Sequence, residues 1–308
     1  MLSLPDEVRS RAVSQGAESW LAELDGVVRG LCSNWGLELG PLLEGGTAAF
    51  VALVRCADDS EAVLKVSVPQ LGFQDQLRLL ERADGRGYVR ILRSDPGRQA
   101  ALLERLGRPL APLIESTAPE PEEQLEVLTQ LLPVAWQVSR EPYESQSWNK
   151  AEQLATMITE LWQRLDRPCP EQVIEQALEC ARRRAEVPRD EWVVVHGDPH
   201  PGNALQVLQD RAGAVAGHVF VDPDGFLAEP AYDVGVTLRD WSRWLVAGDP
   251  HRLMNRYCAL AADRTGLDRD AIWEWAYLER VSSGLFVSSF GEHDRGRRFL
   301  DTAELLLR

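Results

Sequence analysis

Residues 192 to 205, WVVVHGDPHPGNAL, include the side chains of this chain best suited to chemistry. Asp198 is followed five positions later by Asn203. This is the spacing of a kinase catalytic loop, in which the aspartate accepts a hydroxyl proton and the asparagine binds magnesium. In an isolated turn the same two residues would hydrogen-bond their own backbone. A third interpretation makes His196, Asp198 and His200 the ligands of a hydrolytic metal ion, although no further His or Cys cluster in the sequence completes such a site.

A lysine and a glycine-bearing loop precede this stretch in the chain. Lys65 interrupts the apolar strand AVLKV, so it faces either solvent or an anion, and strand alternation alone slightly favours solvent. Gly45, Gly46 and Thr47 lie in the preceding loop, where small residues let backbone amides approach a phosphate. Asp222 ends a later strand in the segment VFVDPDG.

The order of these charged and polar residues is more informative than any one of them. Phosphoryl transfer needs a lysine at the nucleotide phosphates, two ligands for magnesium and a carboxylate at the acceptor hydroxyl. Four residues match these needs in chain order: Lys65, Asp198, Asn203 and Asp222. The sequence therefore predicts a kinase that uses ATP and Mg²⁺.

Two kinds of structure are expected to position these residues. The first part of the chain predicts an opening helix over residues 19–35, a hairpin around the turn ADDS, a helix over residues 71–83 and two strands around SDPGR. A connector rich in proline and acidic residues follows at residues 104–124. Helical spacing then recurs over residues 125–138, 151–165, 170–186 and much of 232–307, with a hairpin between residues 206 and 222.

Composition limits the partners of the chain. Its 308 residues carry a net charge of −15, which disfavours nucleic acid and anionic membranes and makes a cationic small molecule the more natural ligand. The same charge also serves simply to keep a protein in solution. The five cysteines are scattered, and neither a signal-peptide pattern nor a membrane-spanning apolar run is present. We therefore expect a cytoplasmic protein, either a monomer or a homodimer.

The motifs together resemble the aminoglycoside phosphotransferases, and more narrowly their streptomycin 6-phosphotransferase and hydroxyurea-resistance kinase branch. The most specific matches are VVVHGDPHPGNAL and FVDPDGFLAEPAYDVG, and weaker ones such as AVLKV, DGRGYVRIL and ERVSSGL extend over most of the chain. The resemblance implies an α+β, two-lobed, protein-kinase-like fold. Residues 1–106 would form a nucleotide-binding lobe with a small antiparallel sheet and an added N-terminal helix. Residues 107–308 would form a mainly helical lobe with the catalytic loop and acceptor site.

The resemblance also assigns roles to individual residues. It makes Asp198 the catalytic base and makes Asn203 and Asp222 the magnesium ligands. Lys65 would bind the nucleotide phosphates. The same resemblance places three further residues: Glu104 and Leu106 near adenine through the connecting backbone, and Asp233 as a brace for the catalytic loop.

One position departs from the family pattern. The helix after Lys65 should carry a glutamate that pairs with the lysine, but the expected position holds Gln76, next to Asp75. A neutral amide orients an ammonium group less strongly than a carboxylate does. A catalytically silent relative that only binds its ligand is therefore an alternative to an active kinase.

An aminocyclitol antibiotic such as streptomycin is the leading acceptor, and an amino sugar or a hydroxyurea-like metabolite is the alternative. A cationic acceptor should meet carboxylates and flat aromatic surfaces. We expect these in residues 263–294, which hold seven acidic residues together with Trp273 and Trp275: Asp263, Asp268, Asp270, Glu274, Glu279, Glu292 and Asp294.

Overall fold

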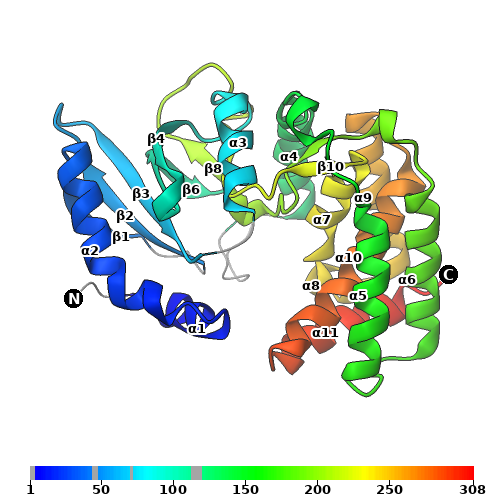
Figure 1. The fold of residues 1–308 in the computed structure, drawn as a ribbon. Helices are drawn as coiled ribbons and strands as arrows, with labels where there is room; N and C mark the ends of the chain where they lie inside the picture. The colour runs from blue at the N-terminus through cyan, green and yellow to red at the C-terminus, as the bar shows by residue number, and fades with distance from the viewer. Residues whose placement is uncertain (1–3, 44–47, 70–71, 112–119) are drawn as a thin grey trace. The chain divides into compact units, whose positions relative to one another are not determined.

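The computed structural model describes residues 4–43, 48–69, 72–111 and 120–308, and the chain forms two units (Figure 1). The first unit is Met1–Arg108 with Leu205–Asp224, and the second is Pro109–Ala204 with Gly225–Arg308. The boundary expected from the sequence, at residue 106, would place residues 205–224 in the helical part. They belong to the first unit because Phe220 forms a parallel bridge with Tyr88 and because two of their strands continue a sheet that starts at Leu106.

An antiparallel sheet with strand order β1-β2-β3-β5-β4 forms the core of the first unit. Its strands are β1 (Glu38–Leu42), β2 (Ala49–Arg55), β3 (Glu61–Ser67), β4 (Ile91–Asp95) and β5 (Ala100–Glu104). The predicted hairpin around ADDS is confirmed, since β2 pairs with β3 from Arg55↔Glu61 to Ala49↔Ser67. A smaller sheet of order β6-β8-β9 consists of β6 (Leu106–Pro109), β8 (Ala204–Val207) and β9 (His218–Phe220).

Helices cover the sheet of the first unit and decide which way its side chains point. The helices are α1 (Asp6–Ser14), α2 (Glu18–Trp35) and α3 (Phe73–Ala83). The apolar stripe of α2 packs on one face of β2 and β3 in a core formed by residues such as Leu24, Val28, Leu64 and Val66. Because side chains alternate along a strand, Lys65 lies on the opposite face of β3 from this core. The predicted N-terminal helix is thus present, preceded by the short α1.

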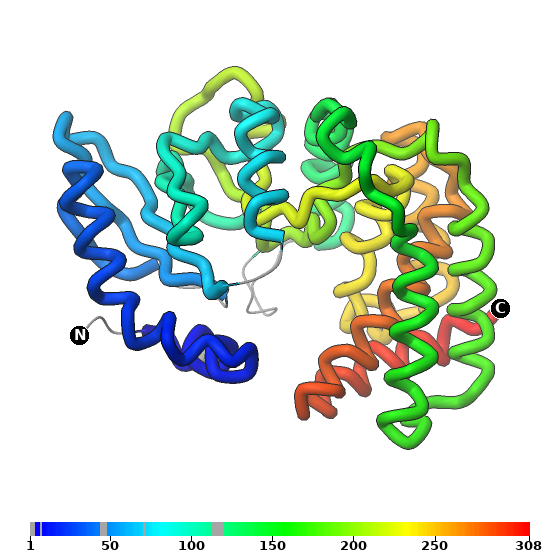
Figure 2. The backbone as a smooth tube through the Cα atoms, in the orientation of Figure 1, coloured from blue at the N-terminus to red at the C-terminus, as the bar shows by residue number. Residues whose placement is uncertain are grey.

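The second unit consists mainly of helices. They are α4 (Pro121–Ala135), α5 (Lys150–Arg164), α6 (Glu171–Ala185), α7 (Ala231–Arg239), α8 (Ser242–Val246), α9 (Pro250–Thr265), α10 (Arg269–Ser289) and α11 (His293–Leu305). The longest, α10, is central and packs against α5, α6, α7, α9 and α11. Its neighbours leave residues on every side of α10 buried, including Trp273 and Trp275 at 2% exposure each. The C-terminus lies beside α6 (Figure 2), where Arg308 N–H donates to Gln176.

Close contact between α7 and α10 depends on one glycine. A Cβ atom added to Gly235 of α7 would lie 2.5 Å from the Cβ atom of Trp275. Any larger residue there would push the two helices apart, and α7 carries several side chains that contact the loop of residues 196–203. A short antiparallel pair, β7 (Val193–Val195) with β10 (Phe226–Ala228), completes the unit and leads into that loop. Within the described ranges, no helix is both long and apolar enough to cross a membrane.

Candidate active site

The loop from His196 to Asn203 connects β7 to β8 and is held through its backbone. The carboxylate of Asp233, on α7, accepts hydrogen bonds from the N–H groups of His196 and Gly197, at 2.8 and 2.9 Å. Asp233 is fully buried, and Trp136 donates a further hydrogen bond to it at 2.8 Å. The expectation that Asp233 braces this loop is confirmed. Gly197 has φ +95°, a left-handed conformation that glycine adopts without strain, so the chain can turn directly after the strand.

Two other side chains of α7 fix the same loop. The hydroxyl of Thr237 donates to the carbonyl oxygen of Pro199 at 3.0 Å. The hydroxyl of Tyr232 donates to the carbonyl oxygen of Gly197 at 3.2 Å. Backbone carbonyls in a turn lack the partners that a strand or helix would supply, and side-chain donors meet that need. The loop is therefore a rigid structure whose side chains have defined directions.

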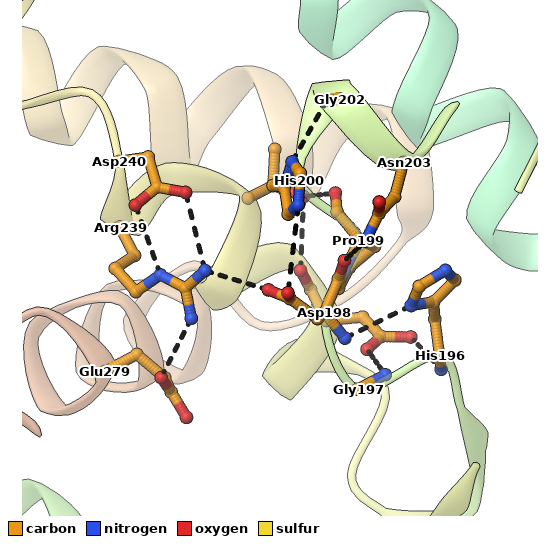
Figure 3. Close-up of polar contacts among 12 residues, drawn as sticks. His196, Gly197, Asp198, Pro199, His200, Gly202, Asn203, Arg239, Asp240 and Glu279 are labelled. Carbon is orange, nitrogen blue, oxygen red and sulfur yellow. Dashed lines mark hydrogen bonds and ion pairs between the residues drawn. The ribbon is translucent and has the colours of Figure 1, made fainter. Parts of the chain in front are cut away.

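Asp198 makes two different contacts through its two carboxylate oxygens (Figure 3). Oδ1 accepts a hydrogen bond from Nη2 of Arg239 at 2.8 Å, and Oδ2 lies 3.8 Å from Nε2 of His200. His200 Nδ1 accepts the N–H of Gly202, so in the neutral ring the proton is on Nε2, facing Asp198. The Asp198 side chain is 39% exposed, which leaves it open to a reactant.

Charges around Asp198 keep it ionised. The largest influence is its partial removal from water, which acts to raise its pKa. The positive charge of Arg239, with smaller contributions from His200 and His196, outweighs this effect, so the pKa of Asp198 lies below its usual value. An ionised carboxylate on a rigid loop can accept a proton from a hydroxyl group.

Arg239 is itself held by three carboxylates. In addition to Asp198, its Nη1 lies 3.3 Å from Oε2 of Glu279, and its Nε lies 3.4 Å from Oδ1 of Asp240 (Figure 3). Burial acts to lower the pKa of Arg239, but the charges of these three carboxylates raise it well above its usual value. The guanidinium group is therefore a permanent cation next to Asp198.

Asn203 is oriented within the same loop. Its side-chain N–H donates to the carbonyl oxygen of Asp198 at 3.0 Å. With the amide nitrogen used in this way, the amide oxygen is the atom of Asn203 that can bind a cation, and such oxygens are ordinary ligands of Mg²⁺. Asp198 and Asn203 are thus brought together in the second unit.

Lys65 and Asp222 are brought together in the first unit. Nζ of Lys65 lies 2.5 Å from Oδ1 of Asp222, and the lysine side chain is only 11% exposed, so the slight preference for a solvent-facing lysine is wrong. Asp222 has φ +56°, a left-handed conformation that is uncommon for aspartate. This backbone differs from the extended segment that strand periodicity would suggest.

Gln76 contacts the backbone next to Asp222. Its amide nitrogen donates to the carbonyl oxygen of Pro223 at 3.2 Å, and the side chain is buried. The neighbouring Asp75 accepts a hydrogen bond from Arg78 at 2.7 Å. The lysine partner that the structure gives is therefore the carboxylate of Asp222, while Gln76 holds the segment that carries this carboxylate.

The expected nucleotide-contacting residues have different outcomes. Gly45, Gly46 and Thr47 lie outside the described residues. The carboxylate of Glu104 pairs with Arg211 of the β8–β9 connection and accepts the N–H of Arg90 at 2.8 Å. Its side chain is thus committed to holding residues 205–224 against the sheet. Leu106 begins β6, directly after Glu104. The adenine contact of Glu104 and Leu106 stays a prediction.

Part of the expected acceptor surface is buried instead. Trp273 stacks on Tyr277, and the indole N–H of Trp275 donates to Glu229 at 2.8 Å. Glu274 is 7% exposed and pairs with Arg183 and Arg184, and Glu279 is 4% exposed. The expectation that these four residues of α10 face a ligand is wrong, because α10 is surrounded by helices. Five exposed acidic residues of the segment remain candidates: Asp263, Asp268, Asp270, Glu292 and Asp294.

The hydrolytic metal site also lacks structural support. Nδ1 of His196 accepts a hydrogen bond from the N–H of Asp198, and Nδ1 of His200 accepts one from the N–H of Gly202, both at 3.1 Å. Among the residues that the structure describes, no group of three or more His, Cys, Asp and Glu side chains is placed to hold a metal ion.

Sequence reasoning missed Arg239 and Arg211. Arg239 lies 41 positions after Asp198, and Arg211 lies 107 positions after Glu104. No spacing rule links residues so far apart. The one sequence signal is that Arg239 lies on the same helix as Asp233, within AYDVGVTLR.

Comparison with known proteins connects the chain to a family. A model of the family described as "Aminoglycoside/hydroxyurea antibiotic resistance kinase" matches residues 35–291. A hydroxyurea phosphotransferase of Kitasatospora aureofaciens is 30% identical over 308 residues, which covers 98% of this chain and 84% of the relative. A streptomycin 6-kinase of Streptomyces glaucescens is 25% identical over 301 residues, covering 97% and 92%.

Solved structures share the fold at low sequence identity. A choline kinase from Streptococcus pneumoniae has a TM-score of 0.59 at 15% identity, covering 92% of this chain and 99% of its own. An aminoglycoside phosphotransferase from Streptomyces rimosus, in complex with ADP and streptomycin, has a TM-score of 0.51 at 18% identity, covering 85% and 98%. The expected α+β, protein-kinase-like fold is confirmed.

Proposed function

Because the chain belongs to the aminoglycoside/hydroxyurea antibiotic resistance kinase family, we propose that it transfers the γ-phosphoryl group of ATP, with Mg²⁺, to a hydroxyl group of an aminocyclitol antibiotic such as streptomycin. The chain is a small-molecule phosphotransferase with a hydroxyl acceptor. Its nucleotide, metal ion and acceptor are the proposed parts.

The observation that carries the proposal is the state of Asp198. It is ionised, partly exposed and fixed on a loop braced by Asp233. A carboxylate of this kind orients an acceptor hydroxyl and takes its proton as the phosphoryl group arrives, a contribution of about a hundredfold to ten-thousandfold in rate. Oδ1 is used by Arg239, so we assign the contact with the hydroxyl to Oδ2.

We assign Lys65 and Asp222 of the first unit to the nucleotide and its metal ion, and we assign Asn203 of the second unit as a further metal ligand. Mg²⁺ bound to ATP neutralises charge that develops on the phosphates during transfer. Asp222 offers a carboxylate that is 49% exposed, and Asn203 offers an amide oxygen; both are the hard oxygen donors that Mg²⁺ prefers. Lys65 supplies the ammonium group for the phosphates, with Asp222 as its partner when no phosphate is bound. This partner weakens the case for a silent relative, which rested on Gln76.

A cationic acceptor agrees with the charge of the chain. The net charge of −15 attracts a guanidino or amino antibiotic and disfavours nucleic acid. The relative that phosphorylates hydroxyurea, at 30% identity, favours a second candidate, a small neutral hydroxyl compound of the hydroxyurea type. We expect action in the cytoplasm, where ATP is available.

An acceptor panel separates the two candidates. The enzyme is incubated with Mg²⁺, γ-labelled ATP and streptomycin, an amino sugar or hydroxyurea, and label transfer is followed at low and at high salt. We expect streptomycin to be the preferred acceptor and its KM to rise with ionic strength, because salt screens its attraction to carboxylates. Preference for hydroxyurea with a salt-independent KM would instead establish the second candidate.

A further inference from the structure

Arg239 connects the catalytic loop to the helical core of the second unit. It is the last residue of α7, its side chain is 15% exposed, and its guanidinium group is shared among carboxylates from the loop, from α7's end and from α10. We infer that Arg239 is a positioning residue for phosphoryl transfer, which holds Oδ1 of Asp198 so that Oδ2 is presented to the acceptor hydroxyl. This inference rests on the proposed function for the role of Asp198.

The two oxygens of Asp198 differ in how firmly they are held. Oδ1 has a hydrogen bond of 2.8 Å from a planar guanidinium group, whereas the contact of Oδ2 with His200, at 3.8 Å, is longer than a hydrogen bond. A carboxylate fixed through one oxygen has its plane and its other oxygen fixed as well. Misplacing a reacting group by about 1 Å costs on the order of a hundredfold in rate.

Arg239 can orient Asp198 because two consecutive residues of α10, Glu279 and Arg280, hold the end of α7. Glu279 contacts the Arg239 side chain at 3.3 Å and is itself buried. The next residue, Arg280, is fully buried and donates to the carbonyl oxygen of Leu238 at 2.9 Å and to Ser242 at 2.6 Å. The side chain of Arg239 and the backbone of the preceding residue are thus both fixed by α10.

The groups around Asp198 agree with this role of Arg239. The cation of Arg239 reaches Asp198 from α7, and the imidazoles of His196 and His200 belong to the loop itself. Three further carboxylates lie close by, and each has a partner: Asp233 takes loop N–H groups, while Asp240 and Glu279 face Arg239. Loss of the arginine would therefore remove the 2.8 Å hydrogen bond that holds Oδ1 of Asp198.

The experiment compares Arg239→Met and Arg239→Lys with wild type by single-turnover transfer and by ATP affinity. Arg184→Met is the matched control, because Arg184 is 17% exposed and also pairs with two glutamates, Glu229 and Glu274. We expect Arg239→Met to lower the transfer rate about a hundredfold while its ATP affinity stays at the wild-type value. Arg239→Lys keeps the charge but not the planar fork, so it should recover only part of the lost rate.

A wild-type transfer rate in Arg239→Met would overturn the inference, as would an equal loss of rate in Arg184→Met. If Arg239→Met does not fold, a wild-type rate in Arg239→Lys overturns the positioning role. Wild-type protein that transfers no phosphoryl group would refute the proposed function. Active wild-type protein together with an Arg239→Met variant that loses ATP affinity as much as rate would refute only the role of Arg239.

Discussion

Lys65 and Asp222 are 157 positions apart in the sequence and form an ion pair in the first unit, with 2.5 Å between Nζ and Oδ1. The lysine is 11% exposed and the aspartate 49%, so the carboxylate keeps the greater access to solvent ions. A magnesium–nucleotide complex would offer each partner a new contact, phosphate for the lysine and metal for the carboxylate. Under the proposed function, the pair would keep both groups in place for such a complex.

The first prediction concerns the magnesium ligands. Asp222→Ala should weaken magnesium-dependent nucleotide binding more than Asn203→Ala does, because the first change removes a charged ligand and the second a neutral one. Calorimetric titration with ATP, with and without Mg²⁺, measures both effects. Asp224→Ala is the control. The left-handed backbone at Asp222 removes the extended geometry that would put Asp224 on the same face. If Asp224→Ala abolishes the magnesium dependence and Asp222→Ala retains it, Asp222 is not the ligand.

The second prediction concerns Gln76. Gln76→Glu would introduce the glutamate that the family resemblance implies at this position, yet we expect it to weaken nucleotide binding. A carboxylate has no N–H to donate to Pro223, and a buried carbonyl left without its donor costs about 1–3 kcal/mol. Urea unfolding measures the loss of stability, and nucleotide titration measures the loss of nucleotide affinity.

Gln130→Glu is the matched control for Gln76→Glu, because Gln130 also donates to a backbone carbonyl, that of Glu126, but from an exposed position. Its free energy of unfolding should change by less than about 0.5 kcal/mol. Tighter nucleotide binding in Gln76→Glu would show that Lys65 lacks a helix carboxylate after all, against the role that we give to Gln76.

The third prediction concerns the contact between α7 and α10. Gly235→Ala would place a methyl group 2.5 Å from the Cβ atom of Trp275, and overpacking of this kind costs about 1–3 kcal/mol. Because α7 holds the catalytic loop, the transfer rate should fall as well. Gly30→Ala in α2 is the control, since its new methyl group has no neighbour within 4 Å and should stabilise the helix by about 0.5–1 kcal/mol. Equal stabilities of the two variants in urea would contradict the close packing.

Several elements of the fold and part of the site could be predicted because their signals are local. The apolar run in AVLKV predicted a strand, and the prolines and glycines around Asp198 and Asn203 predicted a loop that holds these two residues together. The direction of Lys65 was not predictable, because it depends on Asp222, which a distant part of the chain supplies. The same holds for Arg239, whose contact with Asp198 depends on the packing of α7 against α10.

The prediction of the acceptor surface was wrong for another physical reason. Placing Trp273 and Trp275 at a ligand assumed that α10 has one exposed face, as a surface helix does. Helices surround α10 instead, so both indole rings are buried. Helical periodicity identifies a helix but does not show how many of its faces other helices will cover.

The central claim is that Asp198 acts as the base of a phosphoryl transfer from ATP. Its most direct test is single-turnover transfer from γ-labelled ATP to streptomycin, with Mg²⁺, by wild type and by Asp198→Asn, together with ATP affinity for both. We predict label transfer by wild type, a loss of about a hundredfold to ten-thousandfold in Asp198→Asn, and unchanged ATP affinity, because the amide keeps the shape of the side chain but cannot take the proton. Near-wild-type transfer by Asp198→Asn would contradict the account.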